Sequence, residues 1–289
     1  RFLMGSRRAS QKTVEWPTLV LIVLCYALWI GALLMWRGHP LIAVLVLGVI
    51  LAMQPSLMHE ASHGHPTRKA WPTELRVGLP IGLVYPYRRF KALHLRHHAD
   101  ERLTDPFEDP ESYYRARWQH EALPGWLRGT LRVNNTMLGR FVIGPLLGTA
   151  GFVADDWRLL RSGDRAVRKA WAFHALGLLV VLPVVTLVAE RPLWLYVLGP
   201  VWLGQSLISV RTFAEHQWSE RPDGRTLLVE RSPFAFLFLN NHLHLVHHKH
   251  PTVAWYRLPK PFRERRAAWT GMHDRCVFRT YRSLFLSFS

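Results

Sequence analysis

Four long runs of apolar residues, separated by polar stretches, organise the chain. Each run is long enough to cross a bilayer as a helix, which takes about 20 residues. Short turns at residues 37–40 and 190–192 separate the first run from the second and the third from the fourth. The pattern therefore predicts two helical hairpins in a membrane, with spans at about residues 17–36, 41–58, 171–189 and 193–210.

Two shorter apolar segments, residues 75–87 and 141–153, are too short to span a membrane easily. Pro80 and Pro86 also interrupt the first of them. We interpret it as an interfacial or re-entrant segment, with a helix buried on the soluble side as the alternative. The second is rich in glycine, and we expect it to be half-embedded in the membrane.

The formal net charge of +17 comes from residues outside the four apolar runs. Such a charge is typical of membrane proteins with basic cytoplasmic loops, and also of nucleic-acid-binding proteins. Here the basic residues avoid the apolar runs and no recognition motif occurs, so we expect no nucleic-acid partner. The two cysteines, Cys25 in an apolar run and Cys276 in a basic region, do not indicate a disulfide framework.

The distribution of basic residues predicts the orientation in the membrane. Of the 37 Lys and Arg residues, only Arg37 and Arg191 fall in the two short turns. The positive-inside rule then places both termini and both large loops in the cytoplasm. We therefore predict an all-α integral membrane protein, residues 1–289 forming a single domain. Its four transmembrane helices form two hairpins, and residues 59–170 and 211–289 form a helical cytoplasmic cap.

Three histidine clusters lie in this predicted cap, each just after an apolar segment. One reads H-E-x-x-H at 59–63, and H-x-x-H-H occurs at 94–98 and at 244–248. On a helix, residues at i, i+3 and i+4 lie on one side. A single cluster is also compatible with a solvated basic face, but the three together predict a metal site, and eight imidazoles suit two ions. His216 follows its predicted helix as His59 does, so we include it among the predicted metal ligands. The predicted metal ligands are His59, His63, His94, His97, His98, His216, His244, His247 and His248.

An acidic segment at residues 100–111 follows the second cluster. It is compatible with a solvated loop. Alternatively, Asp100 or Glu101 accepts the free N–H of a ligating imidazole and so fixes its tautomer. All-imidazole ligation suits Fe, Zn, Cu or Ni. A structural zinc site takes four ligands and usually thiolate, and neither cysteine lies near a cluster.

The three motifs, with paired membrane helices between them, resemble the integral-membrane fatty acid desaturase and hydroxylase superfamily over roughly residues 17–260. Segments 59–66 and 103–112 are similar to its bacterial branch that includes dihydrorhizobitoxine desaturase. The resemblance implies a non-haem centre of two iron ions held by the eight motif histidines and His216, with molecular oxygen as co-substrate. It also implies that His65, Asn240 and Asn241 lie around the metal ligands without binding the metal themselves.

This resemblance implies an oxygen-dependent desaturase that acts on the acyl chain of a lipid, in a bacterial inner membrane, with its site on the cytoplasmic side. The chain contains no G-x-G-x-x-G motif, so we expect an external electron donor, a ferredoxin-like protein with its reductase. A hydroxylase or carotenoid-type ketolase is the alternative, because the motifs do not distinguish these reactions. A non-catalytic metal-binding membrane protein or transporter is disfavoured, since spans 17–36 and 41–58 hold no histidine or carboxylate.

Overall fold

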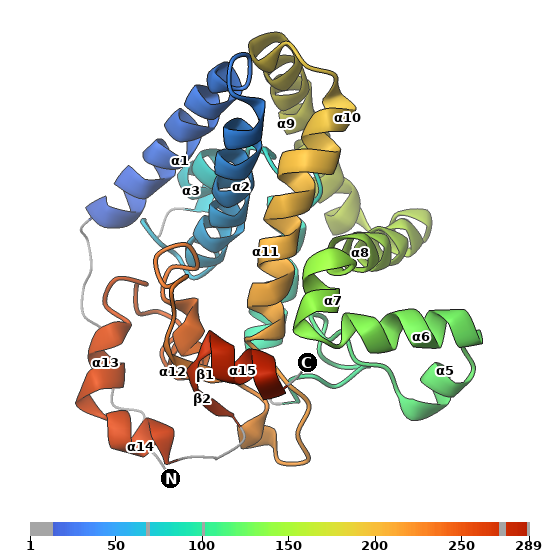
Figure 1. Ribbon diagram of the computed structural model, residues 1–289, viewed down its shortest axis with the longest axis vertical. Helices are drawn as coiled ribbons and strands as arrows, with labels where there is room; N and C mark the ends of the chain where they lie inside the picture. The colour runs from blue at the N-terminus through green and yellow to red at the C-terminus, as the bar shows by residue number, and fades with distance from the viewer. Residues whose placement is uncertain (1–13, 68–69, 100–101, 272–275, 288–289) are drawn as a thin grey trace.

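The computed structural model describes residues 14–67, 70–99, 102–271 and 276–287 and is mostly helical (Figure 1). Among these residues, four helical segments are long and apolar enough to cross a membrane, as predicted: Trp16–Met35, Pro40–Ser62, Arg165–Ala189 and Leu193–Phe213. The turns that join them in pairs lie together at the top of Figure 1, and the C-terminal elements lie at the bottom. His59 and His216 lie near those ends of Pro40–Ser62 and Leu193–Phe213 that face the C-terminal elements.

Helices α1 (Trp16–Met35) and α2 (Pro40–Ser62) pack side by side (Figure 1). Helix α2 continues four residues beyond the predicted span, which ends at residue 58, and its last residue is Ser62. Every side chain from Leu57 to Ser62 is buried, so protein contacts rather than lipid support this last turn. His59 consequently lies inside the helix and not beyond its end.

Helix α9 (Arg165–Ala189) also begins earlier than the predicted residue 171. The Asp164 side chain accepts hydrogen bonds from the N–H groups of Ala166 and Val167, which is a strong helix start. The fourth span consists of α10 (Leu193–Tyr196), a π-helical segment (Val197–Val201) and α11 (Trp202–Phe213).

Helix α11 lies directly against α2 because two glycines remove the side chains between them. A Cβ on Gly48 would lie 2.5 Å from Leu203 Cδ2, and one on Gly204 would lie 2.8 Å from Leu51 Cβ. No larger residue fits at this separation. The close approach brings the C-terminal ends of α2 and α11 together, where His59 and His216 lie.

An irregular segment, residues 78–86, connects α3 (Ala70–Val77) to α4 (Tyr87–Ala99), and we call it the plug. Ile81 in the plug is fully buried in the main apolar core, together with residues of α1, α2 and α9. Backbone carbonyls at alternate positions accept hydrogen bonds from side chains of the spanning helices: Val77 and Leu79 from Gln54, Ile81 from Tyr196, and Leu83 from His174.

Hydrogen bonds from neighbouring helices therefore satisfy the polar backbone of the plug inside an apolar bundle, where unpaired backbone groups are costly. Because residues 78–86 are not helical, the alternative of a buried helix is wrong for this part of the segment. His174, which the sequence places near the start of the third run, has a structural role here.

Helices α7 (Met137–Val142) and α8 (Gly144–Arg161) pack against α11, and α6 (Gly125–Asn134) and α5 (Arg117–Glu121) lie farther from it (Figure 1). The C-terminal region contains short elements: β1 (Leu228–Arg231), α12 (His244–Lys249), α13 (Pro259–Glu264), α14 (Arg266–Thr270), β2 (Val277–Thr280) and α15 (Tyr281–Ser287). Strands β1 and β2 pair in parallel, a small departure from the predicted all-α fold. Four-residue strands this far apart in sequence carry little local signal.

Candidate metal centre

The nine histidines predicted as metal ligands converge where α2, α4 and α11 end and α12 begins. They form two groups, and the candidate ligand atoms of each group all lie within 4.8 Å of one another. Cluster A consists of His59, His63, His94, His98 and His247. Cluster B consists of His97, His216, His244 and His248.

Each H-x-x-H-H motif is divided between the two clusters. On α4, His94 and His98 belong to cluster A, whereas His97 belongs to cluster B. On α12 the division is reversed, and His247 alone joins cluster A. At 3.6 residues per turn, positions i and i+4 differ by about 40°, but i+3 lies about 60° to the other side. One helical side thus serves two neighbouring sites.

The distances between imidazole nitrogens fit metal coordination. Two nitrogens bound to one ion at about 2.1 Å and at right angles lie about 3.0 Å apart. The Nε2–Nε2 distance is 2.9 Å between His63 and His94 in cluster A. In cluster B, His216 Nε2 lies 2.9 Å from the Nε2 atoms of both His97 and His244. Each cluster can therefore hold one ion.

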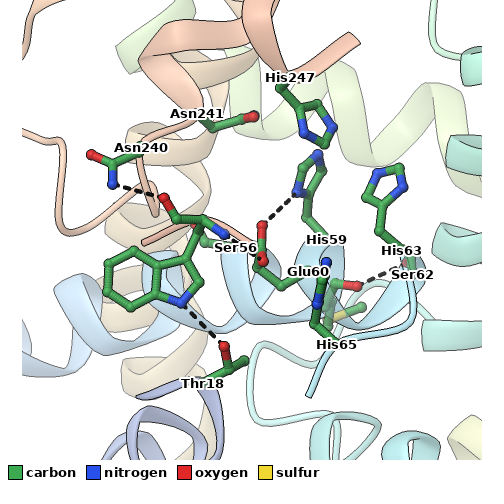
Figure 2. A network of polar contacts seen from close by, with 12 residues as sticks. Thr18, Ser56, His59, Glu60, Ser62, His63, His65, Asn240, Asn241 and His247 are labelled. Carbon is green, nitrogen blue, oxygen red and sulfur yellow. Dashed lines mark hydrogen bonds and ion pairs between the residues drawn. The ribbon is translucent and has the colours of Figure 1, made fainter. Parts of the chain in front are cut away.

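The two clusters are immediate neighbours. The rings of His98 in cluster A and His248 in cluster B stack with centroids 4.1 Å apart. In Figure 2 the rings of His59, His63 and His247 lie close together. The Nε2 of His59 is buried and has no hydrogen-bond partner among the described residues. A metal ion would supply the contact that this nitrogen lacks.

Burial keeps most of these imidazoles neutral, which is the form that binds metal. Burial and neighbouring histidines lower the pKa of His63 to about 3 and that of His98 to about 2. Burial likewise lowers the pKa of His216 to about 3. The pKa of His97 is raised instead, because its hydrogen bond to Asp109 and the nearby carboxylates of Glu111, Asp109 and Glu215 together outweigh the effect of burial.

In cluster B, the Nδ1 atoms of three rings, which are not the candidate metal-binding nitrogens, form hydrogen bonds with the protein. Three Nδ1 atoms have hydrogen-bond acceptors: His97 to Asp109 at 2.8 Å, His216 to the Arg225 carbonyl at 3.2 Å, and His244 to Asn241 at 3.1 Å. Such contacts set the tautomer, so that Nε2 carries the free lone pair. They also orient each ring toward the centre of the cluster.

Asp109 is the outer partner that sequence reasoning missed, because the acidic segment also fits a solvated loop. Its carboxylate is buried and accepts N–H groups from Thr104 and Glu111 as well as the bond from His97. Asp100 and Glu101, the predicted outer partners, lie outside the described residues. The position of Asp109 depends on the path of a loop, for which the spacing offers no signal.

Cluster A has longer outer contacts. His94 Nδ1 lies 3.4 Å from Glu111, and His59 Nδ1 lies 3.9 Å from Glu60 (Figure 2). Glu60 is buried in α2, and its other carboxylate oxygen accepts the Trp255 backbone N–H at 3.1 Å. Glu60 therefore connects the first motif to the loop after α12.

Two other predicted outer residues contact different groups. His65 is buried but pairs with Glu15, at 2.7 Å between Nδ1 and Oε2, and belongs to neither cluster. Asn240 donates to the Trp255 carbonyl at 3.0 Å. Of the two neighbouring asparagines, Asn241 is the one that contacts a cluster histidine.

A buried ion pair, also missed from the sequence, orients Asn241. Arg211 Nε donates to Glu215 at 2.7 Å, and its Nη1 donates to Ser56 on α2 at 3.1 Å. The same Glu215 oxygen accepts the Asn241 amide N–H. With its N–H committed to Glu215, Asn241 must present its oxygen to His244. The pair thus connects α2 and α11 to cluster B.

Comparison with known proteins agrees with this geometry. The model of the protein family described as Fatty acid desaturase matches residues 34–280, a range that includes both clusters. No curated protein matches the chain.

Proposed function

Because the chain belongs to the fatty acid desaturase family, we propose that it is an oxygen-dependent, di-iron desaturase that introduces a double bond into an acyl-like chain. The observation that carries the proposal is the pair of adjoining all-histidine clusters at one end of four apolar helices. Two neighbouring sites of neutral imidazoles suit redox-active metal, and a membrane location suits a lipid substrate.

In this proposal cluster A holds one iron ion and cluster B holds the other, each through imidazole nitrogens. Bound iron supplies the chemistry by which molecular oxygen oxidises an unactivated C–H bond. The protein contributes orientation and exclusion of water. Asp109 and Asn241 hold the rings of His97 and His244, and both rings are almost fully buried. Such preorganisation keeps a reactive centre away from bulk solvent.

The position of the clusters suits a substrate dissolved in the membrane. His59 lies in the last turn of α2, and His216 lies just after α11, so both clusters adjoin the ends of candidate spans. We propose that this end of the helices faces the cytoplasm, because the basic residues avoid the opposite turns. The resemblance of segments 59–66 and 103–112 to a bacterial branch supports a bacterial inner membrane. An acyl chain can then reach the site without leaving the bilayer completely.

Electrons would come from a separate ferredoxin-like protein and its reductase. The net charge of +17 predicts attraction to an acidic partner on the cytoplasmic face. Turnover should therefore fall as ionic strength rises, with the partner concentration held constant.

The test is reconstitution of the purified protein with iron, oxygen, a reductase system and a panel of acyl substrates. Two irons per chain and a new carbon–carbon double bond would support the proposal. A product that retains labelled oxygen would instead identify a hydroxylase or ketolase. Turnover that is unaffected by removing oxygen, or a protein holding one zinc and no iron, would reject the di-iron enzyme.

A further inference from the structure

Arg140 has an unusual position outside the two clusters. It lies on α7, beside α11 (Figure 1), and only 8% of its surface is exposed. Its guanidinium stacks on the Tyr113 ring, 3.7 Å from Cζ to the ring centroid, with the Phe213 ring at 5.6 Å. Aromatic faces attract a cation, but they accept none of its N–H hydrogen bonds in the manner of an anion.

The Nε and Nη2 atoms of Arg140 are buried and have no hydrogen-bond partner among the described residues. These two donors form one edge of the guanidinium, the edge that binds a carboxylate or phosphate in bidentate fashion. Arg89 in the same chain uses this edge in that way. Its Nε lies 2.9 Å and its Nη2 lies 2.7 Å from the oxygens of Asp156.

Arg140 thus has no carboxylate partner of the kind that Asp156 provides for Arg89, although the Arg140 side chain is buried. Burial lowers the pKa of Arg140, while Tyr113 and Tyr114 act in the opposite direction. A guanidinium nonetheless stays protonated in proteins, so its charge must be compensated. A buried charge without a partner is strongly unfavourable. No carboxylate among the described residues contacts this edge, and an oxyanion would supply the missing partner.

A second buried polar atom without a partner lies in the same region. Asn134 Oδ1, at the end of α6, has no hydrogen-bond partner among the described residues. It lies 3.6 Å from the position of a Cβ added to Gly144, and Ser209 Oγ lies 3.0 Å from that position. Gly144 follows Arg140 by four residues, so these groups belong to one junction of α6, α7, α8 and α11. The Ser209 hydroxyl can donate a hydrogen bond to a bound oxyanion, whereas the Asn134 oxygen, an acceptor, can pair only with a head group that carries a proton.

The surface around this junction is apolar. Leu138, Phe141, Val142 and Leu146 on α7 and α8 are exposed. A buried cationic edge beneath an exposed apolar surface suits an amphiphile with a negatively charged head. We propose that the Nε and Nη2 edge of Arg140 binds the carboxylate or phosphate at the head of the acyl-like substrate, an inference that rests on the proposed function.

This position connects the head of the substrate to cluster B. The Tyr113 ring that carries Arg140 donates its O–H to the His216 carbonyl at 3.0 Å. A head group at Arg140 is thus one aromatic ring away from the backbone of a cluster histidine. The Nε and Nη2 atoms of Arg140 are closed to solvent, so the head group must displace neighbouring side chains as it binds.

The experiment measures equilibrium binding to the purified, iron-loaded protein, without oxygen or an electron donor. One pair of probes is a saturated long-chain fatty acid and its methyl ester, and the other is phosphatidic acid and diacylglycerol. Each pair keeps the chains and removes the charge. Wild-type protein should bind the charged member of one pair at least about tenfold more tightly. The pair that shows the preference identifies the source of the oxyanion.

Variants then assign the preference to Arg140. Arg140→Met should reduce it below about twofold, whereas Arg140→Lys should keep part of it, because lysine retains the charge without the bidentate edge. Arg132→Met is the matched control, since Arg132 is an exposed arginine on neighbouring α6. If Arg140→Met does not fold, the wild-type pairs and Arg140→Lys decide the question.

Equal binding of both members in both pairs, or an unchanged preference in either Arg140 variant, would overturn the inference. These outcomes are separate from the fate of the proposed function. A preserved preference in a protein that forms no oxidised product rejects the desaturase and leaves the anion site. Product formation without any preference rejects the anion site alone.

Discussion

In cluster B, three of the four histidines have an outer hydrogen bond of 3.2 Å or less, to Asp109, Asn241 and the Arg225 carbonyl. In cluster A, the outer contacts of His94 and His59 are longer, at 3.4 and 3.9 Å. Cluster A has five histidines, four of them on the helices α2 and α4 or at their ends. Cluster B has four and depends partly on His216, in the loop after α11.

The two clusters differ in how their rings are held. In cluster B, His97 on α4, His244 on α12 and His216 in a loop each have a close outer acceptor. In cluster A, the outer contacts of His94 and His59 are longer. A close outer acceptor orients a ring and fixes its tautomer. Cluster B should therefore lose more iron affinity when an outer hydrogen-bond partner is removed. Cluster A, with five histidines, should better tolerate the loss of one ligand.

The largest expected effect comes from removing one histidine from each cluster. His97→Ala leaves three nitrogens in cluster B, while His247→Ala leaves four in cluster A. We expect His97→Ala to retain about one iron per chain and to lose at least ~100-fold in turnover. His247→Ala should retain more iron. Iron analysis and product assays measure both, with His120→Ala as a control outside the clusters. Greater iron loss in His247→Ala would contradict the comparison.

A smaller effect is expected at the outer carboxylates. Asp109→Asn removes the charge from a 2.8 Å contact to His97, whereas Glu111→Gln alters a 3.4 Å contact to His94. Iron affinity should fall about 10- to 100-fold for Asp109→Asn, within the range known for such partners, and less for Glu111→Gln. Competition with a chelator provides the measurement. Similar losses in both variants would show that the two clusters are held alike.

The two neighbouring asparagines offer a finer test. Asn241→Leu removes the acceptor for His244, and we expect about a tenfold loss of iron affinity. Asn240→Gly removes only the contact to Trp255, and glycine tolerates the left-handed backbone at φ 58°. Its iron affinity should stay at the wild-type value. Loss of iron in Asn240→Gly would place the Trp255 loop among the supports of the clusters.

The smallest expected effect is on the pH dependence of stability without metal. The folded-state pKa values of His63 and His98 lie below the usual value of about 6.5. The unfolded chain then binds more protons, so stability should fall as the pH drops through about 6.5. The raised pKa of His97 acts in the opposite sense. Thermal unfolding of the metal-free protein should show that His98→Ala weakens the acid sensitivity. An equal weakening in His97→Ala would contradict the assigned signs.

The nine histidines could be proposed from the sequence because helical spacing and the ends of apolar runs are local signals, and the structure brings them together in two clusters. Their binding of metal stays a prediction. His94, His97 and His98 could be recognised from their spacing alone. Their division between two clusters could not, because it depends on how α4 and α12 face each other. Four helices long and apolar enough to cross a membrane were also predictable, whereas the last turn of α2, beyond the predicted span, is stabilised by burial in protein.

The remaining parts of the site depend on contacts between distant residues. Asp109 reaches His97 through the path of a loop. Arg211 and Glu215 are four residues apart, but Arg211 donates to Ser56 only when α2 and α11 pack together. The spacing of residues likewise gives no sign that the Nε and Nη2 edge of Arg140 is buried without a partner among the described residues. Such features follow from tertiary packing, which residue patterns along one segment do not describe.

The plug has a consequence for how the protein is made. Its carbonyl at Ile81 is paired with Tyr196, 115 residues later, and that at Leu83 with His174, 91 residues later. While the chain is being synthesised, residues 78–86 leave the ribosome long before these partners exist. Unpaired carbonyls are costly in lipid, so the plug should wait at the aqueous surface until the second pair of spans has been inserted. Helix α4 follows the plug directly, so its three histidines would reach their final place only at that late stage of biogenesis.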